Sequence, residues 1–154
     1  MRRRGGKIGW AMGVAVLMAS LSGGIGRGPG AAEPEVGFRV IVNRDVPVRS
    51  VDRRLLAEVF LKKHTRWSDG KTIRPVDLAS DSPVRVRFSQ EVLRRSVVAV
   101  KNYWQPIIFS GRDVPPPELP SDSAVVQYVN AHPGAIGYVS EAAEIGKAKP
   151  ILVE

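Results

Sequence analysis

The chain has no cysteine and only two histidines among its 154 residues. Without cysteine it can form no disulfide, thiolate nucleophile or cysteine-ligated zinc site. The histidines, His64 and His132, lack the His-x-x-x-His spacing of zinc sites, so no metal site is expected. A glycine-rich nucleotide loop and a nucleophile–base constellation are also missing. We therefore predict no cofactor and no catalytic residues, and expect a protein that is not an enzyme.

The N-terminal residues have the pattern of an export signal. Four basic residues (Arg2, Arg3, Arg4 and Lys7) precede an apolar run over residues 8–21, and small residues ending at Ala32 provide a cleavage site. Glycines interrupt the apolar segment, and about 20 apolar residues are needed to span a membrane. This favours a cleaved signal peptide over residues 1–32; the alternative is a retained membrane anchor. We expect a periplasmic or secreted bacterial protein with one mature domain over residues 33–154 and no stable membrane span.

The net charge of +8 suggests nucleic-acid binding only if the whole chain is counted. Residues 1–32 hold five of the 23 basic residues and none of the 15 acidic ones, so the remaining 122 residues carry a net charge of +3. That is an ordinary charge for a soluble surface. We therefore expect no nucleic-acid partner.

Strand-like and helix-like segments alternate along the expected mature domain. Short apolar runs predict strands over residues 38–42, 73–78, 135–139 and 150–153. Helical spacing of apolar residues predicts helices over residues 52–62 (with Ser50 as N-cap), 83–93, 96–109 and 122–131. A loop is expected over residues 110–120, and a short helix or turn over residues 141–146. The alternation indicates an α/β sandwich around a partly parallel sheet.

One stretch, from Asp77 to Phe88, runs from a predicted strand through a polar loop into a predicted helix. Ser82 stands at the N-cap position and Pro83 at the first helical position. The free N–H groups and the dipole at a helix start favour anions. The candidate anion-binding residues are Ser80, Asp81, Ser82 and Arg85. Two interpretations remain open here: an anion site, or simply the start of a helix.

Six short motifs follow in order: Leu56-Ala-Glu-Val-Phe60, Trp67-Ser-Asp-Gly70, Ser82-Pro-Val-Arg-Val-Arg-Phe88, Tyr103-Trp104, Phe109-Ser-Gly111 and Pro133-Gly-Ala-Ile-Gly-Tyr-Val139. Together they resemble one lobe of the PstS-like phosphate receptors of bacterial ABC importers, which are type 2 periplasmic binding proteins. The resemblance extends from residue 38 to the C-terminus and covers a single lobe. It implies a three-layer α/β/α sandwich.

The resemblance also implies roles for residues at the helix start. In that family a Ser-Gly-Thr-Arg-x-x-Phe sequence holds phosphate through backbone amides and hydroxyls. Ser82, Arg85 and Phe88 occupy the Ser, Arg and Phe places, whereas Pro83 replaces the glycine and Val84 the threonine. Proline lacks an N–H and valine a hydroxyl, so two donors are lost. At about 1.5–3 kcal/mol per hydrogen bond to a charged group, binding weakens by about two to four powers of ten.

The function that the resemblance implies is weak binding of phosphate or a similar oxyanion by an exported domain, or an accessory role in phosphate ABC uptake. The alternative is a protein-interaction module of the cell envelope that reuses the half-receptor fold and has lost ligand binding. Its partner would be a second copy of the chain or an envelope protein. Pro83 and Val84 favour this alternative because they make the loop more apolar.

Overall fold

The computed structural model describes residues 36–154, which all lie in one compact unit. The predicted signal peptide lies outside the described residues. Within residues 36–154, no helix combines the length and the apolar character that crossing a membrane requires.

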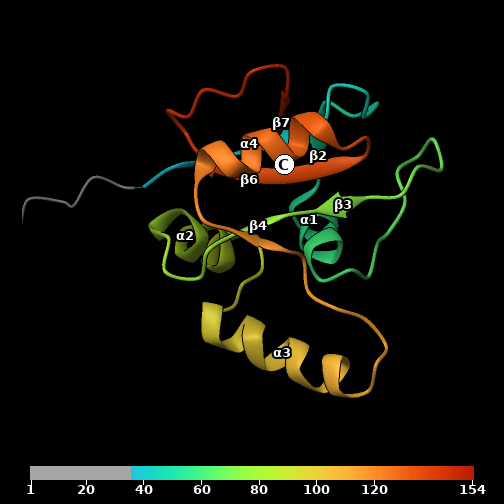
Figure 1. Cartoon of the computed structure of the whole chain (residues 1–154), viewed down its shortest axis with the longest axis vertical. Coiled ribbons are helices and arrows are strands. Elements are labelled where there is room, and N and C mark those ends of the chain that lie inside the picture. The colour runs from blue at the N-terminus through green and yellow to red at the C-terminus, as the bar shows by residue number, and fades with distance from the viewer. Residues whose placement is uncertain (1–35) are drawn as a thin grey trace, which may run out of the picture. The chain divides into compact units, whose positions relative to one another are not determined.

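The main sheet has five strands in the order β2-β7-β1-β6-β3 and is mixed in direction (Figure 1). β1 is antiparallel to both β6 and β7, while β2 runs parallel to β7 and β3 parallel to β6. A separate parallel pair joins β4 and β5. The strand bounds are β1 (Phe38–Val42), β2 (Ser50–Val51), β3 (Arg74–Pro75), β4 (Asp77–Leu78), β5 (Glu118–Leu119), β6 (Ala135–Ser140) and β7 (Lys149–Val153).

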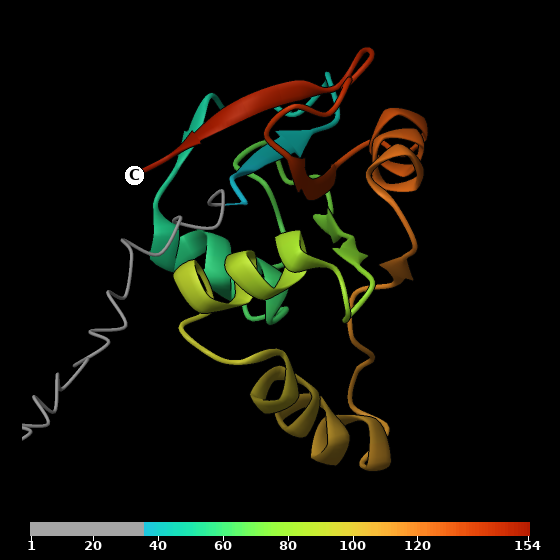
Figure 2. The same ribbon diagram turned by 90° about the vertical axis from the view of Figure 1, so that its left-hand side faces the viewer.

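Four helices complete the described structure, and three of them start at a side-chain cap. Asp52, Ser96 and Ser121 each accept a hydrogen bond from a first-turn N–H group, which satisfies a donor that the helix itself cannot. In both ribbon views, α3 lies at the opposite end of the molecule from β7 and α4 (Figure 2). The helix bounds are α1 (Arg53–Phe60), α2 (Pro83–Glu91), α3 (Val97–Phe109) and α4 (Asp122–Ala131).

Both faces of β6, an inner strand between β1 and β3, are covered, which explains why five of its six residues are buried. Gly137 lies against α4, where a Cβ would come within 2.7 Å of Val125. On the other face, the ring of Tyr138 stacks on that of Phe88 in α2, with 3.8 Å between centroids, and Phe60 of α1 packs against both. Helices therefore sandwich the sheet, and the predicted three-layer α/β/α architecture is confirmed.

Three of the motifs named above supply this aromatic cluster, and a fourth, at residues 67–70, contacts one of them just before β6. The Trp67 Nε1–H group donates to the carbonyl oxygen of Gly134 at 2.9 Å, which ties the 67–70 turn to the sheet. Gly134 has φ +79°, and a Cβ there would lie 2.3 Å from the carbonyl oxygen of Thr72. Only glycine fits this position.

Several local predictions are corrected by the structure. The helix predicted over residues 52–62 is capped by Asp52, because Ser50 lies in β2 and pairs with Leu152. The strand predicted over residues 73–78 divides into β3 and β4, which pair with different strands. The loop predicted over residues 110–120 contains β5. Of the two alternatives predicted for residues 141–146, a short helix or a turn, the structure has turns. Two-residue strands carry too little pattern to be recognised in a sequence.

Candidate functional site

The start of α2 is the region that sequence reasoning singled out. Ser82 is the N-cap residue, with extended backbone geometry, and its side chain makes no capping hydrogen bond. Pro83 occupies the first turn, as expected from its fixed φ and missing N–H. Ser80 and Ser82 are half-buried, and Asp81 is exposed. These three candidate residues therefore lie together on one polar loop between β4 and α2.

Arg85, the fourth candidate, points away from that loop into the fold. Its side chain is only 3% exposed and forms an ion pair with Asp77, which is equally buried in β4. The Nη1 group of Arg85 also lies 3.3 Å from the hydroxyl oxygen of Tyr138, to which it donates. The Nε group of Arg85 is buried and has no hydrogen-bond partner among the described residues. The positive charge of Arg85 is therefore largely balanced by Asp77.

Tyr138 connects the two charged groups. Its hydroxyl donates a hydrogen bond to Asp77 and accepts one from the backbone N–H of Leu78 at 3.4 Å. Burial raises the pKa of Tyr138 well above its ordinary value, so the phenol stays protonated and remains a donor. This network holds β4, β6 and α2 in one arrangement, because each element contributes one of its three side chains.

Lys101 of α3 was not identified from the sequence. Its Nζ group donates to the Oγ atom of Ser80 at 3.2 Å and so places an exposed cation beside the polar loop. Position 101 is separated from position 80 by 21 residues, and no local pattern links them. Only the packing of α3 against α2 brings this charge to the loop.

A cavity of about 260 Å³ lies beside the same loop, between α3, the segment preceding β5, and the Asp77–Arg85 pair. Its apolar walls come from Trp104 of α3 and two prolines of the connecting segment, together with neighbouring aliphatic side chains. Its lining residues are Asp77, Arg85, Val100, Lys101, Trp104, Gln105, Ile108, Pro115, Pro116 and Glu118. The candidate site thus combines a polar helix start with an adjoining pocket of mixed character.

Metal binding finds no support in the described residues. Within residues 36–154, no three His, Asp or Glu side chains are grouped in a way that could hold a metal ion. His64 is exposed, whereas the Nδ1 atom of His132 lies 2.8 Å from the carbonyl oxygen of Tyr128. His64 therefore lies in an exposed segment after α1, and His132 lies at the C-terminal end of α4, so neither belongs to the α2 start.

Comparison with known proteins identifies the fold. No protein-family model and no curated protein matches the chain. Among solved structures, an ABC-type phosphate transport receptor from Vibrio cholerae superposes with a TM-score of 0.61 and 20% identity, over 77% of this chain and 46% of the receptor. A putative phosphate ABC transporter substrate-binding protein from Clostridium perfringens, with bound phosphate, superposes with a TM-score of 0.60 and 17% identity, over 77% of this chain and 45% of that protein. PstS from Borrelia burgdorferi superposes with a TM-score of 0.60 and 12% identity, over 77% of this chain and 47% of PstS.

The extent of these matches is as informative as their scores. The chain spans less than half the length of each of these structures, while most of the chain is included in the match. The matched region corresponds to a single lobe. At identities of 20% or below, the likeness establishes the fold. The described part of the chain therefore has the fold of one lobe of a PstS-like periplasmic binding protein.

Proposed function

We propose that the chain is an exported domain that binds phosphate or a similar oxyanion weakly, or serves as an accessory part of a phosphate ABC uptake system. Support comes first from the fold, which is shared with proteins described as phosphate receptors, one of them with bound phosphate. The basic and apolar pattern of residues 1–32 supports export to the periplasm.

The observation that carries the proposal is the set of hydrogen-bond donors at the start of α2. Val84 and Arg85 lie in the first turn, where backbone N–H groups have no partner within the helix. The hydroxyl of Ser82 is not used for capping and is free to donate. Lys101 adds an exposed positive charge at the same loop through its contact with Ser80. Such an arrangement attracts a small anion.

Two features of the site make the expected binding weak. Pro83 supplies no N–H and Val84 no hydroxyl, which removes two donors relative to a Ser-Gly-Thr sequence. The charge of Arg85 is already paired with Asp77, so it adds little net attraction. With these losses, we expect dissociation constants in about the millimolar range.

Titration of the full chain with phosphate and with sulfate, followed by amide NMR, tests this proposal. We expect the largest shifts at Val84 and Arg85, and weaker binding in Ser82→Ala and Lys101→Ala. Lys147→Ala removes an exposed charge from a distant turn and serves as the matched control. Absence of any shift at millimolar phosphate, or equal effects of Lys101→Ala and Lys147→Ala, would contradict the proposal.

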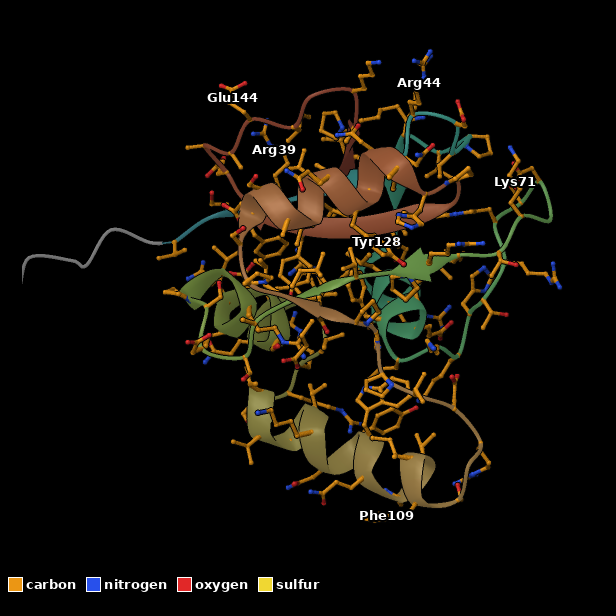
Figure 3. All side chains as sticks on the ribbon, in the orientation of Figure 1. Arg39, Arg44, Lys71, Phe109, Tyr128 and Glu144 are labelled. Carbon is orange, nitrogen blue, oxygen red and sulfur yellow. The ribbon has the colours of Figure 1, made fainter. Side chains whose placement is uncertain are left out.

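The alternative, a protein-interaction module, is favoured by one specific observation. The outer side of α3 and the segment after it expose Phe109 (89%), Val98 (66%) and Val114 (60%). Figure 3 labels Phe109, which is the last residue of α3. Exposed apolar side chains mark an association surface where they form a contiguous patch. Sedimentation of the full chain and of Phe109→Ser tests this function: self-association that the substitution abolishes supports it, and a strict monomer at all concentrations counts against a homodimer.

A further inference from the structure

The cavity between α3 and the segment preceding β5 has a composition that a phosphate site would not have. Trp104, which is 4% exposed, forms part of its wall. The remaining apolar wall consists of Val100, Ile108, Pro115 and Pro116. At about 260 Å³ the cavity is slightly smaller than the roughly 300–1,000 Å³ of sites for drug-sized ligands. A cavity of this size and lining suits a small organic molecule with an apolar body.

The cavity is lined by two acidic and two basic side chains, and the acidic ones lie on strands while the basic ones lie on helices. Asp77 and Glu118 come from the neighbouring strands β4 and β5, where they are directly paired in register. Arg85 and Lys101 come from α2 and α3. The cavity therefore has two carboxylates on one side of its lining and two cationic groups contributed by the helices.

Two of these groups have unused capacity for a ligand. The carboxylate of Glu118 makes no hydrogen bond or ion pair with any residue in the described part of the chain. The buried Nε group of Arg85 also lacks a partner among residues 36–154. An unpaired buried donor is unfavourable, and a bound acceptor would satisfy it directly or through a water molecule. The cavity thus offers an acceptor for a cation and a donor for an anion.

We propose that this cavity binds a small zwitterion with an apolar body, of the kind represented by an α-amino acid with an apolar side chain. The ammonium group lies toward Glu118, the carboxylate toward Lys101 and Arg85, and the apolar body against Trp104. Because Asp77 and Arg85 neutralise each other, a simple anion would meet the carboxylate of Glu118, and a simple cation would meet the ammonium group of Lys101. A zwitterion satisfies both sets of groups. This cavity adjoins the α2 start and shares Lys101 with it, and its proposed ligand goes beyond the proposed function.

Calorimetric titration of the full chain with L-leucine, L-phenylalanine and two single-charge analogues of leucine tests the inference. 3-Methylbutylamine keeps only the ammonium group of leucine, and 4-methylpentanoate keeps only its carboxylate. We expect L-leucine or L-phenylalanine to bind, and each analogue to bind at least about tenfold more weakly than leucine, as expected for the loss of one charged contact. Failure of both amino acids to bind at about 10 mM, or equal binding of an analogue, would overturn the inference.

Substitutions at two exposed positions test the orientation of the bound zwitterion without disturbing the buried Asp77–Arg85 pair. Glu118→Gln should weaken binding of leucine and of the amine but not of 4-methylpentanoate. Lys101→Ala should weaken leucine and 4-methylpentanoate but not the amine. Glu144→Gln, at an exposed position outside the cavity lining, should change none of them. Unaltered leucine affinity in Glu118→Gln would also overturn the inference.

The same titrations separate this inference from the proposed function. Phosphate binding without amino-acid binding leaves the anion site standing and removes the zwitterion site. Amino-acid binding without phosphate binding supports the zwitterion site and removes the anion site.

Discussion

The buried Asp77–Arg85 pair should show strong energetic coupling. Arg85→Met leaves the Asp77 carboxylate in a buried position without its cation, and Asp77→Asn leaves the guanidinium without its anion. Breaking a buried pair from one side costs about 3–5 kcal/mol. Removing both charges together avoids that penalty, and an asparagine at position 77 still accepts a hydrogen bond from Tyr138. We therefore expect the double variant to lie within about 2 kcal/mol of the parent.

Urea denaturation followed by circular dichroism measures this coupling. For a domain of this size the free energy of unfolding falls by about 2 kcal/mol per molar urea. Each single substitution should therefore lower the unfolding midpoint by about 1.5–2.5 M, whereas the double substitution should lower it by about 1 M or less. Arg74→Met, at an exposed position of β3, is the matched control and should change stability by no more than about 0.5 kcal/mol.

The double-variant comparison also gives the result that would refute this reasoning. If the losses of the two single variants add in the double variant, the two side chains do not interact in the native state. Arg85 would then be free to face the polar loop, and Asp77 would not neutralise its charge.

Three further predictions concern packing, pH and the exposed face of α3. Gly137→Ala should destabilise the domain by about 1–3 kcal/mol in urea melts, because its Cβ would collide with Val125; an unchanged midpoint would show that α4 moves aside. The hydrogen bond from Lys62 holds the pKa of Asp113 below its ordinary 3.8. Asp113→Asn should therefore be less stable than the parent above pH 3.8, and this difference should vanish as the pH falls through the lowered pKa. A stability difference that grows in acid would contradict this prediction. Phe109→Ser should leave stability within about 0.5 kcal/mol, and a larger loss would mean that this ring is buried in solution.

The long elements of the fold could be predicted from the sequence because their patterns are local. The strand at residues 38–42 and the helix at residues 122–131 have the predicted bounds. In α3, the helix continues through Pro106 to Phe109. The two-residue strands β2 and β5 were missed, because their pairing partners lie far away in the chain.

The candidate site was less accessible to sequence reasoning, for a related reason. Ser82 and Pro83 could be placed at a helix start because capping is a local property. The inward direction of Arg85 depends on Asp77 and Tyr138, which lie on two different strands. The position of Lys101 depends on how α3 packs. The sequence shows that charged residues occur here, but which of them pair is determined by the tertiary structure.

The most direct test of the central claim is the amide NMR titration of the full chain with phosphate. We expect saturable shifts that are largest at Val84 and Arg85, with a dissociation constant in about the millimolar range. Binding should be weaker in Lys101→Ala and unchanged in Lys147→Ala. Shifts that are absent, or that spread over all basic surface residues and respond equally to both substitutions, would contradict it.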